Sequence, residues 1–593
     1  MKNYISICAA AIYLSLTFSC KKPLKDFLEK APGVDVTENL VFSNRVNAEA
    51  YVSTMYQFGM VSIFSSRDGA ITSNPATGSS VNTFGTLAGA TDECENEAAF
   101  AFAQQWNSGS IQSATILGQE DNRYFGRWKA IRIANILLER IDEVPDADAA
   151  FKSQVKGEAQ FIRGLQNFET LKRYGGIPIV TKRFISGNEA VVPRSTLEES
   201  VNAIVKDCND AVTNLPSSYP ATQRGRATKI AAMSLKSRTL LYAASPLFNT
   251  ATPFLPMADA ANNKLICYGN ADINRWKLAA DAAKAVLDEA TFANVSLIDV
   301  PANRDPTVAN RSLGNYWTAW DVRDNNEIII ADKTFGALSR FNFPWYHIIP
   351  TAMGSFWVAN SVTHNFIRKY ENKVTGLPQT WNLAGGNDLV TKYNELDPRF
   401  KQSIGYNGGR WNANHPIIEI FPGGRHERLC FGGAWMLKHI PEAVENTNVV
   451  PAIALYRLNE FFLNYAEALN EFQGPVPEAY TAVNRIRTRS GMPNLPAGLS
   501  QSQFRTRVRN ERDIELAFED HRFWDIRRWL IAEEDGVMTG PMYGIRVGRI
   551  TTTTFSYLPY VFETRVFLKR MYLHPYLLSE VLKGNLVQNP GWE

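Results

Sequence analysis

The stretch Arg509–Trp529, RNERDIELAFEDHRFWDIRRW, is the most informative part of the 593-residue chain. Its carboxylates Glu511, Glu515 and Glu519 recur at i, i+4 spacing and would share one face of a helix. Carboxylates this close repel one another unless cations lie nearby, and arginines occur within three or four residues of each carboxylate. The expected cations are Arg507, Arg512 and Arg522, and the aromatic residues expected beneath them are Phe518, Phe523, Trp524 and Trp529. The pattern predicts a structural ion-pair lattice rather than an active site.

Paired amphipathic helices are predicted before this stretch. Apolar side chains repeat every three or four residues over 128–141 and again over 151–174, which is typical of a helical hairpin. Gly175 and Pro178 end the second helix, because glycine accepts the left-handed cap conformation and proline cannot continue a helix. Further helices are predicted over 197–212, 230–247 and 274–287, the last without an obvious partner.

A last hairpin is predicted over 455–472 and 480–486, with small residues at close-packing positions. Repeated hairpins of this kind resemble tetratricopeptide repeats, in which each pair buries its open face on the next. The predicted fold is therefore mostly α, with a tetratricopeptide-like scaffold mainly at 120–290 and 450–530. The large irregular, loop-rich region is expected mainly at 60–115 and 290–450, and a further irregular stretch at 535–563.

The amino terminus predicts export and a lipid anchor. Lys2 precedes an apolar run at 5–18, and small Ser19 precedes Cys20, which together indicate a signal peptide at 1–19. A cysteine at this place is typical of lipidation, which would tether the mature chain 20–593 to a membrane. Ordinary secretion with an incidental cysteine is the alternative. No later apolar segment is long enough to span a bilayer.

Composition and motifs exclude several function classes. The 62 Lys and Arg against 59 Asp and Glu form no basic patch, so no nucleic acid is expected as a partner. No metalloprotease, nucleophile-elbow, phosphate-loop or dinucleotide motif is present, so no catalytic residue, cofactor or metal ion is expected. The absence of these motifs does not exclude a glycoside hydrolase, because such an enzyme needs only two carboxylates at a suitable separation. The acidic group Asp92, Glu93, Glu95 and Glu97 is expected to be a solvated loop, with a catalytic pair or a calcium site as the alternatives.

Several motifs in the order expected of one family run through the mature chain. Besides RNERDIELAFEDHRFWDIRRW, they are RWKAIRIANILLERID at Arg127–Asp142, LKRYGGIPIV at Leu171–Val180, AASPLFN at Ala243–Asn249, RWKLAADAAKAVLD at Arg275–Asp288 and KRMYLHPYLLSEVLKGNLVQNPGWE at Lys569–Glu593. Together they resemble the SusD/RagB family of outer-membrane nutrient-binding lipoproteins.

The resemblance implies a cell-surface lipoprotein that captures an oligosaccharide or another nutrient. It would deliver this ligand to a SusC-like TonB-dependent transporter of the outer membrane, without catalysis. The alternatives are a glycoside hydrolase acting on the same glycan, or a helical-repeat scaffold that binds proteins and no soluble ligand.

A sugar site needs a flat aromatic ring beside hydrogen-bonding side chains, because pyranose rings have apolar C–H faces and a rim of hydroxyls. Residues 316–357 contain ten aromatic residues in 42 positions, whereas the chain as a whole is 11% aromatic. The residues expected to bind the ligand are Trp106, Asn107, Trp317, Trp320, Asp321, Arg323, Trp345, Tyr346 and Trp357. Burial in the core is the alternative for each ring. Trp128, Trp276, Trp524 and Trp529 lie in helical patterns and are assigned to the core.

Overall fold

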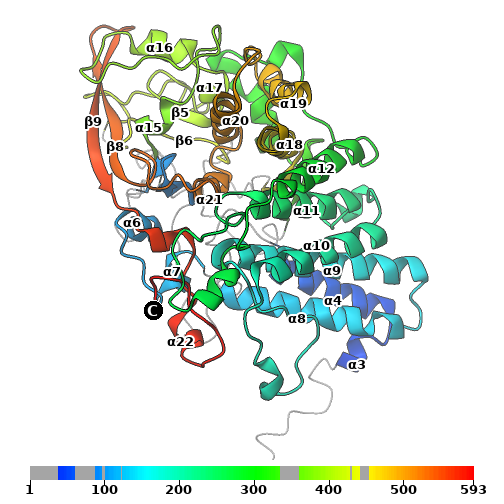
Figure 1. Ribbon diagram of the computed structural model, residues 1–593. Helices are drawn as coiled ribbons and strands as arrows, with labels where there is room; N and C mark the ends of the chain where they lie inside the picture. Colours follow the sequence, from blue (N-terminus) through cyan, green and yellow to red (C-terminus); the bar gives the residue numbers. More distant parts are fainter. Residues whose placement is uncertain are drawn as a thin grey trace, which may run out of the picture.

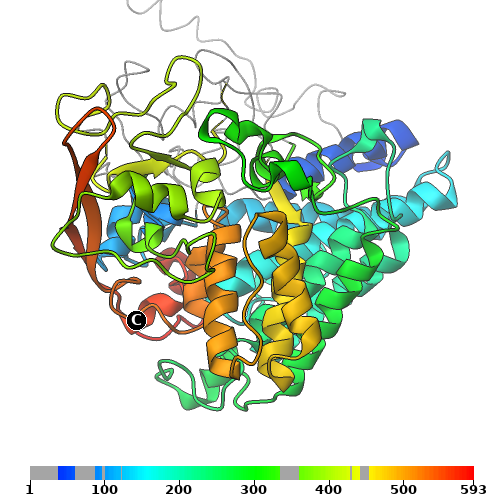
Figure 2. The ribbon, with the colours of Figure 1, turned by 90° about the horizontal axis from the view of Figure 1, so that it is seen from above.

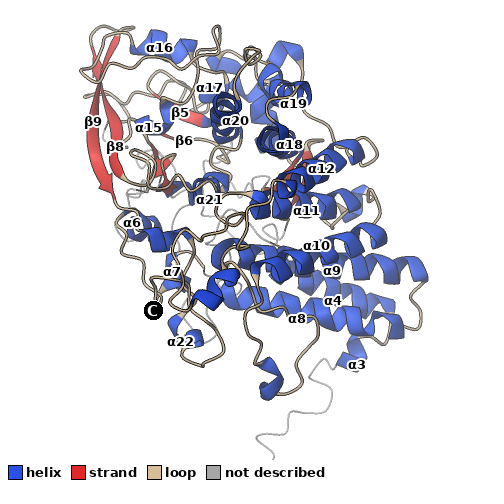
Figure 3. Cartoon of the chain, in the orientation of Figure 1, coloured by secondary structure: helices blue, strands red, loops and turns tan. Residues whose placement is uncertain are grey.

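The computed structural model describes residues 38–60, 87–96, 101–121, 123–333, 360–427, 430–440, 442 and 453–593. Helices dominate these residues (Figure 3), and the mostly α fold expected from the sequence is confirmed. The longer helices are α4 (Arg45–Gly59), α8 (Tyr124–Arg140), α9 (Ala149–Tyr174), α10 (Leu197–Asn214), α11 (Lys229–Ala244), α12 (Asn274–Glu289), α18 (Leu458–Gln473), α19 (Pro477–Arg489), α20 (Gln501–Glu515) and α21 (His521–Arg528). The shorter helices are α3 (Glu38–Val41), α6 (Phe102–Asn107), α7 (Ile116–Gln119), α13 (Asn315–Asp321), α15 (His364–Ile367), α16 (Leu389–Glu395), α17 (Arg399–Ser403) and α22 (Leu578–Val581).

The helices α8 to α12 stack in sequence order, with α4 packed against α8 and α9 (Figure 1). The predicted ends are visible in the backbone, since α9 stops at Gly175, whose φ of 79° is left-handed. Close packing also depends on glycine, because a Cβ added at Gly157 of α9 would lie 2.7 Å from Leu215 Cγ. Local sequence signals therefore fix the lengths of these helices and allow neighbouring layers to approach.

The helix that lacked an obvious partner in the sequence has two partners. α12 packs against α11, which precedes it, and against α18, which lies far along the chain. Trp276 and Ala280 of α12 belong to the same buried cluster as Leu463 and Ala466 of α18. A contact across so many residues leaves no local trace, which is why periodicity did not reveal it.

The loop-rich part lies beside the helical stack. Seen from above in Figure 2, the long helices occupy one side and strands β8 (Gly540–Arg549) and β9 (Phe555–Arg565) the other. A five-stranded antiparallel sheet in the order β1-β2-β4-β6-β5 organises the loops. Its strands are β1 (Ala90–Thr91), β2 (Cys94–Glu95), β4 (Ser361–Val362), β5 (Ile404–Tyr406) and β6 (Ala434–Met436). A separate two-stranded pair joins β3 (Ile328–Ala331) to β7 (Ala454–Arg457).

Two expectations about this part were wrong. The stretch 535–563 was expected to be irregular, but β8 and β9 form a long antiparallel hairpin that pairs Gly540 with Arg565 and Arg549 with Phe555. The C-terminal helix was expected to include Leu455, but 454–457 form β7, and α18 begins at Leu458. In both places hydrogen bonding to another strand decides the structure: β8 pairs with β9, and β7 pairs with the distant β3. This pairing prevails over the helical or loop preference of the local sequence.

None of the described helices combines the length and the apolar composition that a bilayer span requires. Among the described cysteines, Cys94, Cys208 and Cys267 are buried free thiols.

The ion-pair lattice expected at Arg509–Trp529 exists, but its cations come from elsewhere. Glu511 accepts hydrogen bonds from Arg399 at 2.6 Å and Arg487 at 2.8 Å, and Glu515 accepts one from Arg399 at 2.9 Å. Glu519 pairs with Lys438 at 2.6 Å. The three arginines expected to serve these carboxylates bind others instead: Arg507 pairs with Glu371, Arg512 with Asp525 and Arg522 with Asp92.

The single helix implied by the i, i+4 spacing is also interrupted. α20 ends at Glu515, and Phe518 and Asp520 both have a left-handed φ of 62° before α21 begins. The N–H of Phe518, which a continuing helix would use, donates to Glu93 Oε1 at 3.0 Å. The stretch is a buried helix–turn–helix that binds the loop-rich part to the helical stack.

The buried ion pairs predict that the protein becomes less stable as the pH falls into the acidic range. Burial alone would raise the pKa of Glu467, but the Arg528 guanidinium lowers it to about 2 from 4.5. A carboxyl whose pKa falls on folding stabilises the fold above pH 4.5 and loses that contribution as pH falls toward 2. We expect the free energy of unfolding to drop over this window, with a share of order 3 kcal/mol from Glu467.

Chemical denaturation between pH 5 and pH 2.5 measures this dependence. Glu467→Gln is expected to be less stable at pH 6 and to have a shallower pH profile over the window. Glu143→Gln is the matched control, because that carboxylate lies on the surface and pairs only with Arg140 in the described chain. A wild-type profile that stays flat down to pH 2.5 contradicts the prediction.

Candidate functional site

The first predicted ligand residue, Trp106, is fully buried on α6. Its ring packs edge-to-face on Phe523, with centroids 5.1 Å apart, and against His574 at 4.8 Å. The Arg527 guanidinium lies 4.9 Å from the ring centroid. Asn107 is buried too, and its amide donates to Gly89 O at 3.0 Å. The expectation that Trp106 and Asn107 present a ring and an amide to solvent was wrong, because α6 turns both side chains inward.

Trp317 and Trp320 of α13 are likewise buried, at 1% and 2% exposure. Their rings contact each other with centroids 4.5 Å apart, and the Arg311 guanidinium lies 4.6 Å from Trp317. The two rings and Tyr316 form a small cluster of their own under the loops. The expected outward display of these rings was therefore also wrong, since their apolar faces are already covered by each other and by Arg311.

The remaining predicted residues differ in position. Arg323 is exposed just after α13, and Asp321 is half-buried at its last position, where burial raises the pKa of its carboxyl. Trp345, Tyr346, Trp357 and the lipidation residue Cys20 lie outside the described residues.

The acidic group of the early loop is not solvated. Asp92 is fully buried and accepts hydrogen bonds from Arg522 at 2.8 Å and Lys369 at 2.6 Å. Glu95 is 4% exposed and pairs with Arg565 at 2.7 Å. Glu97 lies outside the described residues. The expected solvated loop was wrong for the described members: Asp92 and Glu95 pair with cations inside the fold, and the buried Glu93 accepts a hydrogen bond from the N–H of Phe518. No group of three or more metal-ligating side chains occurs among the residues that the structure describes.

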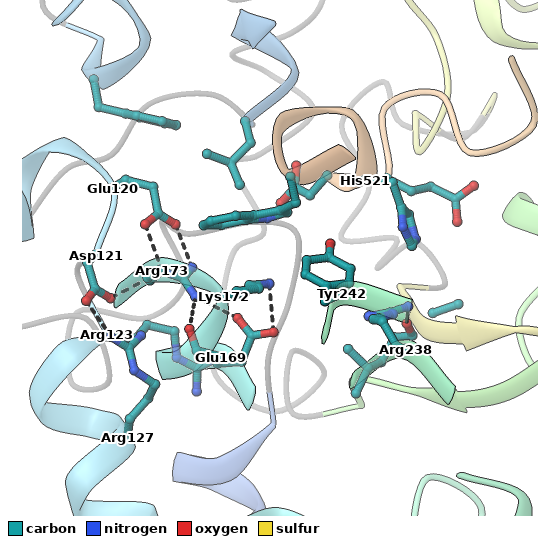
Figure 4. A pocket seen from close by; sticks show the side chains of 17 residues that line it. Glu120, Asp121, Arg123, Arg127, Glu169, Lys172, Arg173, Arg238, Tyr242 and His521 are labelled. Carbon is teal, nitrogen blue, oxygen red and sulfur yellow. Dashed lines mark hydrogen bonds and ion pairs between the residues drawn. The ribbon is translucent and has the colours of Figure 1, made fainter. Parts of the chain in front are cut away.

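A charged cavity lies between α9, α11 and α21 (Figure 4). Figure 4 shows Glu120, Arg173, Lys172 and Glu169 joined by ion pairs, with Arg173 Nε 2.8 Å from Glu120 and Lys172 Nζ 2.7 Å from Glu169. Burial lowers the pKa of Lys172 to about 8, even though Glu169 opposes that shift. Each of these carboxylates already has a cationic partner.

The size of this cavity excludes a sugar ring. It encloses about 100 Å³, which is room for a few water molecules. Ligand pockets usually offer roughly 300 to 1,000 Å³. The charged cavity is therefore a water-sized space between the helical stack and the loop-rich part. Four of its charged side chains, Glu120, Glu169, Lys172 and Arg173, are paired with one another.

A polar groove opens beside the turn between α10 and α11. It consists of two adjoining hollows of about 270 and 330 Å³ that share Arg224, Arg226 and Lys333. Its other polar lining residues include Glu49, Ser53, Tyr56, Tyr219, Gln223, Asn294, Asp324, Asn325 and Asn326. These residues come from α4, the turn between α10 and α11, the end of α12 and the segment around β3. Amide, hydroxyl and guanidinium groups at this density suit the hydroxyl rim of a sugar.

The polar groove is held open by its own ion pairs. Lys333 pairs with Asp324, and Arg226 donates to Glu49 at 3.0 Å and to Glu158 at 2.8 Å. Arg224 is exposed and reaches Asp324 O at 3.5 Å. The predicted residue Arg323 directly precedes Asp324 in the chain, but it does not itself line either hollow of this groove.

A second groove contains a residue that the sequence assigned to the core. Trp128 of α8 is only half-buried and lines a hollow of about 460 Å³ with Phe125, Phe184 and several cations. Trp276, Trp524 and Trp529 are buried as predicted, at 8%, 4% and 4% exposure. The signal that could have distinguished Trp128 is the run of basic residues around it, Lys129 and Arg132 on the same helix.

Comparison with known proteins identifies the family. The model of the SusD family matches residues 333–592, and a model for starch-binding proteins associating with the outer membrane matches residues 26–241. SusD-like protein P38 of Formosa agariphila is 23% identical over 70% of this chain and 73% of its own length.

Solved structures share the fold. A SusD-like protein of Bacteroides fragilis superposes with a TM-score of 0.74 at 24% identity, covering 95% of this chain and 100% of that one. A SusD-like carbohydrate-binding protein of the same species gives a TM-score of 0.66 at 19% identity, covering 92% and 99%. With family models matching both the amino-terminal helices and the carboxy-terminal half, the chain belongs to the SusD/RagB family.

Proposed function

We propose that this protein binds an oligosaccharide in the polar groove and passes it to a SusC-like TonB-dependent transporter, without catalysis. The match of residues 26–241 to a starch-binding, outer-membrane-associated family is the observation that carries the proposal. The polar groove supports it with an open lining of amides, hydroxyls and guanidinium groups, part of which comes from those matched residues. Tyr56 and Tyr219 are the aromatic rings among the described lining residues of the groove. Trp345, Tyr346 and Trp357 are proposed as further ligand-binding residues.

We infer that the signal peptide 1–19 is removed and that Cys20 carries the lipid that holds the mature chain on the outer membrane, with its body at the cell surface. Metabolic labelling with a palmitate analogue is expected to mark the wild type and not Cys20→Ala. Protease treatment of intact cells is expected to cleave the wild-type protein. A Cys20→Ala variant that is labelled equally well would refute lipidation at this residue.

Arg224→Ala and Arg323→Ala are expected to weaken oligosaccharide binding. Loss of one hydrogen-bonding side chain at an exposed site costs about 0.5–1.5 kcal/mol, a factor of roughly two to ten in the dissociation constant. Isothermal titration of the protein lacking residues 1–20 against maltoheptaose and other neutral oligosaccharides measures this effect. Both side chains are exposed, so their removal should leave the fold intact.

Lys277→Ala is the matched control, because this exposed lysine of α12 lies outside both grooves and pairs with Asp281. Affinity unchanged in both arginine variants would remove the polar groove as the site. If chromatography detects a product formed from the bound glycan, the protein is a glycoside hydrolase rather than a binding protein. If the protein binds the transporter but no soluble ligand, it is a protein-interaction scaffold.

A further inference from the structure

The groove around Trp128, called the cationic groove below, shares no lining residue with the polar groove. Its floor is apolar and includes the flat rings of Phe125, Trp128 and Phe184, together with Tyr124. α8 supplies the rings of Tyr124, Phe125 and Trp128. Tyr124, Trp128 and Arg132 lie on one face of this helix, since they recur at four-residue spacing. The segment after α9 and the region of α22 close the other sides. The volume of about 460 Å³ is within the range of ligand pockets.

The rim of the cationic groove has an excess of positive charge. Lys129, Arg132, Lys182, Arg183 and Lys583 line it, against the single carboxylate of Glu580. Three of these cations are already engaged inside the protein. Arg183 pairs with Glu38 and Glu139, Lys583 lies 2.8 Å from Glu580, and Lys129 sits 3.8 Å from the centroid of the Phe58 ring.

Besides Lys129, which contacts only the Phe58 ring, two cations have no carboxylate partner among the described residues. Arg132 donates one hydrogen bond to Phe184 O at 2.9 Å, which fixes its guanidinium at the groove and leaves its other N–H groups available. Lys182 is exposed and makes no hydrogen bond or ion pair with another described side chain. Unmatched positive charge beside flat apolar rings favours a ligand that has an apolar face and an anionic group.

We propose that the cationic groove binds an acidic oligosaccharide, a chain with a uronate carboxylate or a sulfate group. A pyranose C–H face would stack on Trp128 while the anion meets Arg132 and Lys182. An open groove with half-exposed rings suits a sugar chain, whereas an acyl chain is better covered in an enclosed tunnel. The polar groove differs, since two of its three cations, Arg226 and Lys333, are paired with Glu49 and Asp324. This inference rests on the proposed glycan-binding function and adds a second site with a different ligand charge.

Titration of the protein lacking residues 1–20 with tetragalacturonate and with the neutral maltotetraose tests the proposal. Tetragalacturonate is expected to bind, and more weakly as NaCl rises from 50 to 500 mM, because salt screens exposed charges. Trp128→Ala is expected to weaken this binding about fivefold, as for the loss of one stacked ring, and Lys182→Gln about threefold. Trp128→Phe, which keeps a ring, should retain most of the affinity and shows that the fold is intact.

The controls separate this site from the polar groove. Lys277→Gln removes one positive charge far from the cationic groove and should leave tetragalacturonate affinity unchanged. Trp128→Ala should leave neutral oligosaccharide binding unchanged, whereas Arg224→Ala should weaken only the neutral ligand. Neutral binding without tetragalacturonate binding would overturn this inference and leave the proposed function standing. Binding to anionic phospholipid vesicles that requires Trp128, without tetragalacturonate binding, would overturn it in favour of a membrane-facing surface.

Discussion

Replacement of Arg399 by methionine is expected to lower the free energy of unfolding by about 3–5 kcal/mol. Arg399 is fully buried and bonds Asp397 at 2.7 Å, Glu511 at 2.6 Å and Glu515 at 2.9 Å. Methionine fills similar space, so the main loss is the positive charge rather than packing. Three carboxylates would then remain buried with fewer cations, and burial of an uncompensated charge is costly.

Urea unfolding at pH 7, followed by circular dichroism, measures this loss. Lys277→Met is the matched control, since its ion pair with Asp281 is on the surface, with side chains 51% and 58% exposed. That pair is expected to contribute at most about 0.5 kcal/mol. Glu511→Gln combined with Arg399→Met should cost less than the sum of the two single changes, because they share one interaction. An Arg399→Met variant as stable as the control would show that the buried lattice does not hold the fold.

The helical stack could be predicted because its signals are local. The apolar repeat of 151–174 and the glycine at Gly175 act within a few residues, and α9 ends at that glycine. The same reasoning failed at 535–563, where Gly, Pro and Thr suggested loops. There the regular structure is made by cross-strand pairing between β8 and β9, which local propensity does not encode.

The ion-pair lattice shows where sequence reasoning stops. The i, i+4 spacing of Glu511 and Glu515 indicated that cations must lie between them. It could not indicate Arg399, which is more than a hundred residues away and arrives through the packing of α17 on α20. A charge pattern predicts that partners are required, and only the fold chooses them.

The candidate site was the least predictable part. Aromatic enrichment over 316–357 suggested a display of rings, but enrichment does not say which way a ring points. On α13, Trp317 and Trp320 cover each other. On α8, in contrast, Trp128 fits a core pattern yet lines a groove. Arg323 precedes Asp324 of the polar groove in the chain, but none of the predicted residues that the structure describes lines either hollow.

Trp106→Ala is expected to destabilise the protein by about 3–5 kcal/mol, as for other large-to-small changes in a core. The indole is 0% exposed and contacts Phe523, His574 and the Arg527 guanidinium, so its removal leaves a cavity between α6 and α21. The affinity of the folded protein for an oligosaccharide should not change, because the ring offers no face to a ligand. Urea unfolding measures the first effect, and titration at 10 °C, where the variant is still folded, measures the second.

Two further variants decide between a core ring and a ligand platform. Trp106→Phe keeps part of the packing and should cost less than the alanine change. Phe292→Ala should alter stability by no more than about 0.5 kcal/mol, because that ring is 74% exposed. If Trp106→Ala were as stable as Phe292→Ala and yet lost oligosaccharide binding, Trp106 would be a ligand contact after all. If the variant is less stable but binds the oligosaccharide with unchanged affinity, Trp106 belongs to the core between the helical stack and the loops. The ligand contacts are then made by side chains that reach solvent.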